Sequence, residues 1–498
     1  MRKLKKITVL AVSFAFVAAA CGSDDDKAAD TTSGGAASTA APAATDAPVE
    51  TDAPVETDAP VETDAPVETD APVETDAPVE TDAPAESIDP ASIKTDIGVD
   101  DETIKIGMNA DLSGIFAPLV TQIVDGQEAY WEIVNENGGI GGRQIELVIL
   151  DNAYDVPKHL ENYEVMSGEG EEGVVMFSQS TGSPHTAATA AQLVEDDMIA
   201  IPLTWYSGWA DPDIGKNVFE VQITYCLESI NGISYLAEST GGTKVAIVSF
   251  PGEYGQDGAA GAKIAAEELG LEVVYDGEGA VVPGADQTPV ITEIVNSGAD
   301  FVWLTVNPPS TAEIIGGAYE QGFRGMWSGN SPSYNFQLLG TDLAPVLDEV
   351  YTHSTYTALW NTSDVPGMTD LVEGMRAQRP DAPVSDVYVI SWIEGYVTQQ
   401  ILEQAARNGD MTRAGVVAAA NEITADLQGL APDQTWAGEP NDYIVRESYL
   451  YDVDLASFTA GATVSDEDAG TGFTLLEGPY VSDLAAEFDY QEPCFVAG

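Results

Sequence analysis

The chain has 498 residues, of which 83 are Asp or Glu and only 18 are Lys or Arg, so its formal net charge at pH 7 is −65. Such a charge repels the phosphates of nucleic acids and of anionic lipids, which makes both improbable partners. The excess of acidic residues fits a halophilic or marine habitat.

Residues 1–20 predict a signal peptide. Basic residues between Arg2 and Lys6 precede an apolar run from Ile7 to Ala20, which is too short to span a bilayer as a permanent helix. Three alanines then lead into Cys21, which resembles the lipobox of a bacterial lipoprotein of the actinobacterial style, where the cysteine becomes the acylated N-terminus. The alternative is ordinary signal cleavage near Ala20, which would leave Cys21 as a free thiol.

Residues 21–100 have the composition of an acidic, proline-rich tether. Seven hexads occupy residues 45–86, six reading TDAPVE and the last TDAPAE. A proline in every hexad and two acids beside it oppose both helix and sheet. At about 3.1 Å per residue, a polyproline-like repeat reaches on the order of 130 Å, enough to hold a domain clear of a membrane. The alternative is an adhesive or ligand element, although no aromatic or hydrophobic anchor recurs in the hexad.

The folded part, residues 101–498, opens with a βαβ pattern. Apolar residues alternate from Ile104 to Met108, as in a strand, and then recur at helical spacing from Leu119 to Val134. Gly138 and Gly139 are expected to end this helix. Residues 144–150 predict the next strand. The motifs IKIG, LSG and NENGGIGGR, followed by a strand that ends in Asp151, resemble the start of the type I solute-binding proteins, the leucine/isoleucine/valine-binding family of ABC importers.

The resemblance continues along the chain and covers roughly residues 103–450. It includes the segments FSQSTGSPHTAA, MIAIPLT, SFPGEYGQDGAAGAK, DFVWLTVN and SDVYVISWIEGYVTQQILEQAARNG. Strand and helix alternation alone would also fit an unrelated flavodoxin-like or Rossmann-like protein.

The remaining pattern predicts a doubly wound α/β fold. Strands are expected at 173–178, 198–204, 244–250, 271–275, 300–306 and 349–356, and helices at 184–196, 311–321, 387–407 and 413–427, the last one after a cap at Thr412. The resemblance implies two Rossmann-like lobes joined by three crossovers, with lobe 1 at about 102–222 and 356–440 and lobe 2 at about 223–355 and 441–498. Ligand would lie in the cleft between them. After Tyr451 we expect irregular loops.

No catalytic constellation is recognisable in the sequence. The three histidines, His159, His185 and His353, stand far apart, no HExxH, GxSxG or P-loop motif occurs, and the cysteines lack metal-ligand spacing. Pairs of acids arise by chance at this acid content and do not indicate a glycosidase. We therefore expect no enzyme activity, no metal and no cofactor. His185 is expected at a helix start, beside the candidate ligand loop.

Polar side chains follow two predicted strands of lobe 1. Hydroxyls and helix-start N–H groups in the loop 178–183 can receive a carboxylate. In the family that the chain resembles, this loop and the segment after the next strand hold the ligand's carboxylate and amine. The resemblance therefore assigns ligand contacts to Ser178, Ser180, Thr181, Thr204, Trp205 and Tyr206. Trp205 would form a wall for an apolar or planar ligand, unless it packs at the lobe surface.

Lobe 2 would contribute Tyr254, which matches the tyrosine that the family closes onto its ligand, and also Asn307 and Asn330. Phe116, after the LSG turn, would lie at the cleft mouth. The family often has an acid at the position of Asn330, which pairs with the ligand's ammonium. Asparagine there puts a free amino acid in doubt, because a buried ammonium needs a carboxylate partner. Three other acids could supply it, namely Glu253, Asp257 and Glu394.

Two cysteines remain if Cys21 is acylated. Cys226 and Cys494 would then be an even remainder in an oxidising compartment, which favours one disulfide between them. The alternative is two buried free cysteines, because the sequence does not show whether their Cα atoms lie within about 7 Å.

These features together predict an extracytoplasmic, lipid-anchored, monomeric substrate-binding protein of an ABC importer. It would capture a small polar or amphipathic solute, either an amino acid, including a branched-chain one, or an amide, urea-like compound or carboxylate. The closed form would bind the permease subunits in the membrane. The alternatives are a sensory or surface receptor module without a transport role, a hydrolase on the same fold, which lacks a nucleophile and base, and a structural surface protein built around the repeat.

Overall fold

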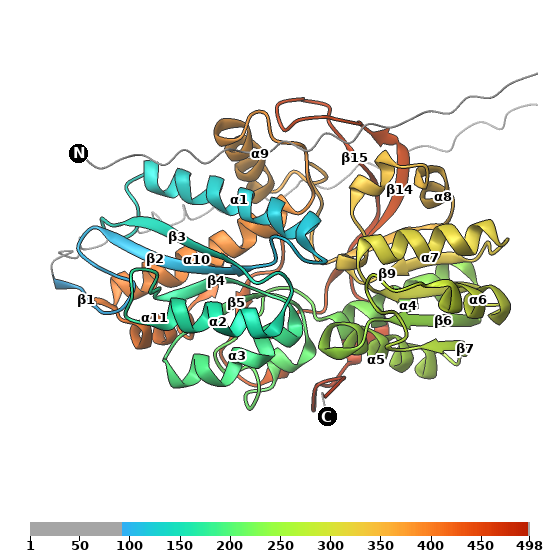
Figure 1. Cartoon of the computed structure of the whole chain (residues 1–498), viewed down its shortest axis with the longest axis horizontal. Helices are drawn as coiled ribbons and strands as arrows, with labels where there is room; N and C mark the ends of the chain where they lie inside the picture. The colour runs from blue at the N-terminus through green and yellow to red at the C-terminus, as the bar shows by residue number, and fades with distance from the viewer. Residues whose placement is uncertain (1–91, 497–498) are drawn as a thin grey trace, which may run out of the picture. The chain divides into compact units, whose positions relative to one another are not determined.

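The computed structural model describes residues 92–496, which form two α/β lobes and an antiparallel arm (Figure 1). The predicted signal peptide, the acylation of Cys21 and the hexad tether lie outside the described residues. Among residues 92–496, no helix is long and apolar enough to cross a membrane.

The first lobe contains a parallel sheet with the strand order β3-β2-β4-β5. Its strands are β2 (Thr103–Ala110), β3 (Gln144–Asp151), β4 (Met176–Thr181) and β5 (Ala200–Leu203). The helices of this lobe are α1 (Ala117–Glu136), α2 (Val156–Ser167), α3 (Ser183–Glu195), α9 (Pro366–Gln378), α10 (Tyr388–Arg407) and α11 (Arg413–Ala420), and the short strands β1 (Lys94–Thr95) and β11 (Asp410–Met411) pair at its edge. Helices on both faces explain why β4 is buried at every position.

The second lobe repeats this order as β7-β6-β8-β9. Its strands are β6 (Lys244–Ser249), β7 (Glu272–Gly277), β8 (Phe301–Thr305) and β9 (Met326–Gly329), and its helices are α4 (Tyr225–Thr240), α5 (Gly252–Glu268), α6 (Thr288–Ser297), α7 (Pro308–Glu320) and α8 (Ala344–Val350). In both lobes the first strand in sequence lies between the second and the third, as in doubly wound folds. The predicted α/β class is therefore confirmed.

A long antiparallel arm follows the second lobe. It consists of β14 (Ser448–Phe458) and β15 (Thr471–Tyr480), and β14 also pairs with β10 (Thr352–Thr355). The irregular loops that we expected after Tyr451 are therefore found in the turn of the arm, residues 459–470, but the expectation is wrong for the strands on either side of it. The first four side chains of β14 are all buried, and its last residues and most of those of β15 are half-exposed or exposed, so neither strand shows the alternation of buried and exposed residues that predicts a strand from sequence.

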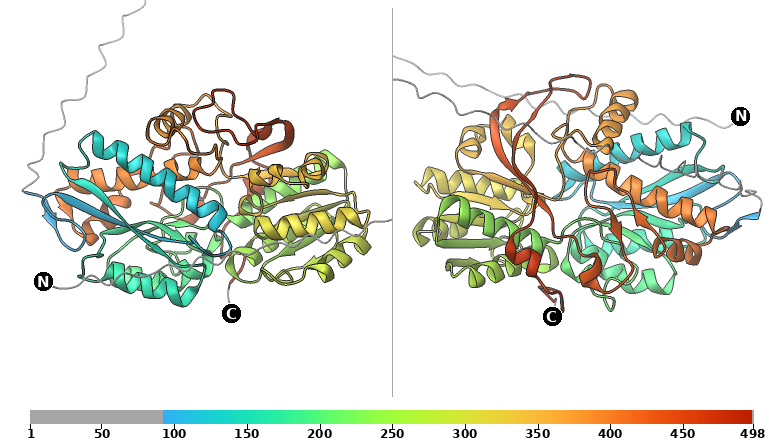
Figure 2. Two further views of the ribbon diagram at one scale, coloured as in Figure 1. Left: turned by 45° about the horizontal axis from the view of Figure 1, so that its top comes forward. Right: turned by 180° about the vertical axis from the view of Figure 1, so that it is seen from behind.

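The turn of the arm reaches the first lobe, where it lies beside α9 in Figures 1 and 2. The backbone N–H of Val464 donates to the Ala382 carbonyl at 2.9 Å, and the Nε of Arg376 donates to the Val464 carbonyl at 2.7 Å. The arm therefore connects both lobes across the space between them.

Besides the arm, the main chain passes between the lobes at three places. These are the segments between β5 and α4, between β10 and α9, and between α12 (Pro440–Tyr443) and β14. Two of them lie side by side, because Ile223 and Val445 form a parallel bridge.

One predicted helix is shorter than expected. The hydroxyl of Thr412 caps α11 by accepting the N–H of Gly415 at 3.1 Å, as predicted. The helix ends at Ala420 rather than Leu427, because Thr424–Ala425 forms β12 and pairs with β13 (Gln434–Thr435). Apolar residues beyond Ala420 gave a helical pattern to a segment that pairs as a strand.

Candidate ligand-binding site

A cavity lies between the two lobes, with about 840 Å³ of space between its atoms, including the part open to solvent. We call it the central cavity. The first lobe contributes α1, the start of α10 and the loops after β3, β4 and β5. The second lobe contributes α4, α5 and the segments after β9 and β10, and the arm contributes Phe473. Its lining is Phe116, Leu119, Val120, Ile123, Tyr154, Thr181, Gly182, Leu203, Trp205, Tyr225, Tyr254, Ser331, Pro332, Tyr334, Asn335, Phe336, His353, Thr355, Tyr356, Thr357, Leu359, Asp386, Val387, Ile390 and Phe473.

Most of this lining is aliphatic or aromatic. Helix α1 presents Leu119, Val120 and Ile123 from one face, since residues three and four apart in a helix lie on the same side. Val387, the N-cap of α10, and Ile390 in its first turn are three residues apart and also line the cavity. The cavity therefore offers a long apolar wall to the body of a ligand.

A few buried polar atoms in the lining have no hydrogen-bond partner within the part of the chain that the structure describes. They are the hydroxyl oxygens of Thr181, Tyr334 and Tyr356, Nδ2 of Asn335 and Nδ1 of His353. Buried polar groups are normally hydrogen-bonded. These atoms are therefore available to a polar group of a ligand or to water. Burial lowers the pKa of His353 to about 3, so its imidazole is neutral at pH 7.

Two aromatic residues of the lining, Trp205 and Tyr254, have polar atoms that already form hydrogen bonds within the protein. Trp205 stacks on Tyr356 with the ring centroids 4.2 Å apart, while its Nε1 donates to Oε1 of Gln222 at 2.9 Å. The Tyr254 hydroxyl donates to the Val306 carbonyl at 2.7 Å. Both side chains therefore present ring surface, rather than donors, to the cavity.

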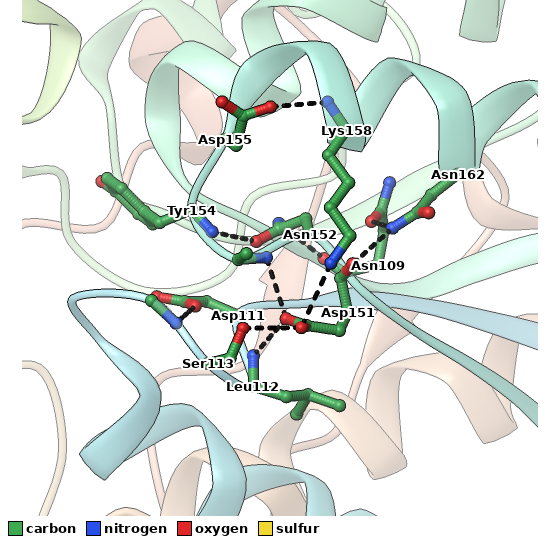
Figure 3. A network of polar contacts seen from close by, with 12 residues as sticks. Asn109, Asp111, Leu112, Ser113, Asp151, Asn152, Tyr154, Asp155, Lys158 and Asn162 are labelled. Carbon is green, nitrogen blue, oxygen red and sulfur yellow. Dashed lines mark hydrogen bonds and ion pairs between the residues drawn. The ribbon is translucent and has the colours of Figure 1, made fainter.

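Two carboxylates order the loops that contain Phe116 and Tyr154, which both line the cavity. Figure 3 shows the contacts of Asp151 and the position of Asp111 beside it. Asp111 accepts the backbone N–H of Phe116 at 2.8 Å. Asp151 accepts Leu112 N–H at 3.0 Å, the hydroxyl of Ser113 at 2.7 Å, Ala153 N–H at 2.8 Å and the ammonium of Lys158 at 3.2 Å. Burial by itself would raise the pKa of Asp151, but these donors hold it at about 2. The carboxylate thus joins the LSG turn to the β3–α2 loop.

Four of the predicted contacts in the first lobe lie outside the lining of the central cavity. Ser178, Ser180, Thr204 and Tyr206 are buried, and their hydroxyls are already paired. Ser180 pairs with the hydroxyl of Thr186 at 2.8 Å, and Tyr206 donates to the Phe495 carbonyl at 2.6 Å. Thr181, Trp205 and Phe116 do line the cavity.

In the second lobe Tyr254 lines the cavity, whereas Asn307 and Asn330 do not. Asn307 caps α7 by accepting Ser310 N–H at 3.0 Å. Asn330 is saturated, because its Nδ2 donates to the Tyr225 carbonyl at 2.9 Å and to the Glu228 carboxyl at 2.8 Å, and its Oδ1 accepts the Thr305 hydroxyl at 2.7 Å. Both asparagines therefore have structural partners.

The acid that lines the central cavity is one that sequence reasoning missed. Asp386 accepts Trp360 N–H at 3.1 Å and the Thr471 hydroxyl at 2.7 Å, and burial raises its pKa to about 7. None of the three acids proposed as ammonium partners is in the lining. The segment SPSYNF after β9, which supplies Tyr334, Asn335 and Phe336, was also missed, although a polar loop after a strand end was a usable signal.

Two further features concern candidate residues. The structure joins Cys226 and Cys494 in a disulfide, with Cα atoms 6.3 Å apart. His185 is buried beside Tyr154, with ring centroids 4.4 Å apart, and does not line the central cavity. Among residues 92–496, no three His, Cys, Asp or Glu side chains are placed to hold a metal ion.

The periplasmic binding protein family model matches residues 103–461. The chain belongs to this family. The expected resemblance is thereby confirmed, and it rests on most of the described residues. The Leu/Ile/Val-binding protein homolog 2 of Brucella abortus is 28% identical over 228 residues, which are 46% of this chain and 60% of that relative. The chain therefore matches less than two thirds of the length of its curated relatives.

Solved structures of periplasmic binding proteins show the same fold. A fatty acid ABC transporter substrate-binding protein from Thermomonospora curvata is 30% identical, with a TM-score of 0.72 over 81% of this chain and 98% of that one. A branched chain amino acid ABC transporter protein from Thermus thermophilus with bound valine is 19% identical, with a TM-score of 0.65 over 78% and 98% of the two chains. At that identity the second likeness concerns the fold alone.

Proposed function

We propose that this periplasmic binding protein is the extracytoplasmic substrate-binding protein of an ABC importer, and that its ligand is an elongated amphipathic carboxylate such as a fatty acid. Among the solutes expected from the sequence, this choice favours the carboxylates over amino acids, amides and urea-like compounds. The observation that carries it is the lining of the central cavity, which combines an extended apolar wall with few unpartnered polar atoms.

The lining argues against a free amino acid. An α-ammonium group needs an ionised carboxylate in a buried site. The acid in the lining, Asp386, already accepts two hydrogen bonds, and its raised pKa favours the neutral form relative to an ordinary aspartate. A small amino acid would also leave much of the apolar wall without contacts.

Thr181 is the proposed place for the carboxylate. Its hydroxyl is unpartnered among the described residues, and Gly182 beside it is the N-cap of α3, where backbone N–H groups favour an anion. An alkyl chain would then lie along Leu119, Val120 and Ile123 of α1 and extend toward Phe473 of the arm. The relative from Thermomonospora curvata, whose name specifies fatty acids, supports this ligand class.

Closure of the lobes on the ligand would create the surface that the permease subunits bind. Contacts between lobes are consistent with a closed form, since Nδ2 of Asn307 donates to the Ile115 carbonyl at 3.3 Å and the rings of Phe116 and Tyr254 lie 5.9 Å apart. We also propose that the protein acts as a monomer, that acylated Cys21 anchors it, that the hexads are a tether, and that it catalyses no reaction.

Calorimetric titration of the full chain tests the ligand class. The series runs from butanoate to hexadecanoate, with leucine, isoleucine and valine as competitors. Each additional buried CH₂ contributes about 0.8 kcal/mol, so affinity should rise about fourfold per CH₂ until the cavity is filled. Tighter binding of leucine than of decanoate would reject the proposal. Uptake of the labelled ligand with reconstituted permease subunits would separate transport from a sensory role.

A further inference from the structure

A second cavity lies beside two of the segments that join the lobes. Its space between atoms is about 760 Å³, including the part open to solvent. We call it the hinge cavity. Its lining is Trp209, Ala210, Pro212, Gly215, Lys216, Val218, Phe219, Glu220, Gln222, Asn421, Gln434, Trp436, Gly438, Tyr443, Ile444 and Val445. The hinge cavity has no lining residue in common with the central cavity. Val445 belongs to the Ile223–Val445 bridge and Gln222 precedes it, so the hinge cavity contacts the connections between the lobes.

Two buried donors of the lining lack an acceptor among residues 92–496. They are Nε1 of Trp209 and Nε2 of Gln222, in side chains that are 3% and 4% exposed. The orientation of the Gln222 amide is fixed chemically, because the indole N–H of Trp205 can only donate and contacts Oε1 at 2.9 Å. The amide NH₂ is therefore the end that remains for the hinge cavity. Neither donor can act as an acceptor, so an occupant must supply acceptor atoms.

Glu220 adds a third polar group to the same cavity. Its Oε1 is buried without a hydrogen-bond partner in the described chain. Burial, and then the charge of Asp257, raises the pKa of Glu220 well above its ordinary value, so a neutral carboxyl can donate a proton to an acceptor. Lys216 is an exposed cation in the lining, and it favours an anion over a cation.

The remaining wall is aromatic. The rings of Phe219 and Trp436 meet edge to face with centroids 5.1 Å apart. Nε1 of Trp436 donates to the Glu220 carbonyl at 2.7 Å, and the Tyr443 hydroxyl donates to the Ala210 carbonyl at 3.0 Å. Because these polar atoms are already paired, the rings offer ring surface to an apolar body.

We propose that the hinge cavity is a second binding site, which takes a small monocarboxylate with a compact aromatic or aliphatic body. The carboxylate would accept hydrogen bonds from Trp209, Gln222 and Glu220, and the body would lie against Phe219 and Trp436. A carboxylate suits this set because its two oxygens can accept several donors at once. Water could satisfy single donors, but it would leave the aromatic wall without a partner.

Gln222 connects this site to the central cavity. Its φ of +84° lies in the left-handed region that residues other than glycine rarely adopt, at the point where the chain enters the second lobe. Its amide oxygen and the Val221 carbonyl both accept the indole N–H of Trp205, at 2.9 and 3.0 Å. Trp205 in turn lines the central cavity and stacks on Tyr356. An occupant of the hinge cavity therefore contacts the residue that positions a wall of the central cavity. The two ligands should change each other's affinity by the same factor.

Benzoate, benzamide and benzylamine are suitable probes, because they place an anion, a neutral amide and a cation on the same ring. We expect the full chain to bind benzoate with its central cavity first saturated by decanoate, to bind benzamide more weakly, and not to bind benzylamine. Trp209→Phe keeps a ring but removes the N–H, and it should weaken benzoate binding about fivefold or more. The free chain should keep its melting temperature within a few degrees.

A blocking variant makes the test specific to the cavity. Asn421 is exposed and lines the hinge cavity, so Asn421→Trp should fill its mouth and abolish benzoate binding. Asn296→Trp, on the exposed side of α6, is the matched control and should bind benzoate normally. Four results would overturn the proposal. They are unchanged binding in Asn421→Trp, simple competition between benzoate and decanoate, preferred binding of benzylamine, and a crystal structure with benzoate that shows only water in the hinge cavity. The Asn421→Trp result stands even if decanoate does not bind and the proposed function fails.

Discussion

Asp257 of the second lobe accepts two hydrogen bonds from Ser207 of the first lobe, one from the backbone N–H at 3.0 Å and one from the hydroxyl. The same carboxyl accepts Cys226 N–H at 3.2 Å. The Asp257 side chain is fully buried, so these donors have no access to water. One carboxyl thus joins the two lobes and the start of α4.

We expect Asp257→Asn to destabilise the protein at pH 8, above the pKa of about 7 of this carboxyl, because the amide NH₂ would face a donor in place of one oxygen of the ionised carboxylate. Leaving a buried donor unpaired costs about 1–3 kcal/mol in the free energy of unfolding. Urea unfolding of the full chain measures this loss. Glu267→Gln, an exposed change on the same helix, is the control. An unchanged midpoint in Asp257→Asn would show that the contact between lobes contributes little.

A second prediction concerns the pH dependence of stability. Burial raises the pKa of Glu228 to about 8 and those of Asp257 and Asp386 to about 7. Unfolded carboxyls titrate near pH 4, so between about pH 4 and 7 or 8 these three groups bind more protons in the folded state than in the unfolded state. Each group therefore lowers the free energy of unfolding by about 1.4 kcal/mol per pH unit as pH rises through this window. Burial lowers the pKa of His159 and His353 to about 3 and that of His185 to about 4, so these histidines act in the opposite direction below about pH 6.5, where unfolded histidines become protonated. The net free energy of unfolding should therefore fall between about pH 7 and 8.

Urea midpoints at pH 7 and pH 8, measured at constant ionic strength, test this sign. Repulsion within a chain of net charge −65 acts in the same direction, so a variant is needed to isolate the buried groups. Glu228→Gln removes one titrating group and should reduce the difference between the two midpoints. Greater stability at pH 8 than at pH 7 would contradict the prediction.

A third prediction tests the proposed carboxylate position. Thr181→Val removes the unpartnered hydroxyl and keeps the shape of the side chain. It should weaken binding of a fatty acid by about three- to tenfold, since a neutral hydrogen bond contributes roughly 0.5–1.5 kcal/mol. The melting temperature without ligand should not fall. Thr189→Val is the control, because that hydroxyl bonds to the Thr186 carbonyl and lies outside the cavity lining. Equal affinities in both variants would place the carboxylate elsewhere.

The sequence predicted the fold better than it predicted the side chains of the site. Strand β4 shows why, because successive residues of a strand point to opposite sides. Ser178 and Ser180 share one side of β4, and Thr181, the residue that lines the central cavity, is on the other. The resemblance identified the right loop. The alternation of side chains along a strand would have shown that Thr181 faces the opposite side from Ser178 and Ser180.

Other parts of the site depended on contacts between distant segments. Asn330 has the composition of a ligand contact, but Thr305, Glu228 and Tyr225 saturate it, and nothing in its local sequence indicates these partners. Phe473 reaches the cavity because the arm pairs with β10, a pairing across about a hundred residues of chain. Such long-range pairing is not readable from local periodicity.

A fourth prediction concerns Asp151 and the loops at the cavity mouth. Because its folded pKa is about 2, Asp151 stabilises the protein above pH 4, and this contribution is lost as pH falls from about 4 toward 2. Asp151→Asn should lower the free energy of unfolding at pH 7 by about 1–3 kcal/mol, since several donors lose a charged acceptor. It should also weaken ligand binding by loosening Phe116. Asp155→Asn, at the N-cap of α2, is the control, because asparagine caps helices about as well as aspartate does.

The final prediction concerns the arm as a wall of the central cavity. Phe473 lines this cavity, and its ring lies 5.1 Å from that of His353 and 5.6 Å from that of Tyr334. If an alkyl chain extends from Thr181 toward the arm, Phe473→Ala removes contacts that only longer chains make. We therefore expect a clear loss of affinity for hexadecanoate and little change for hexanoate, measured by calorimetry on the full chain. Phe458→Ala, on the same arm but outside the lining, should spare both affinities. Equal losses of affinity for hexanoate and hexadecanoate would show that Phe473 stabilises the arm without contacting the end of the alkyl chain. The alkyl chain would then end before it reaches Phe473 or lie in the opposite direction.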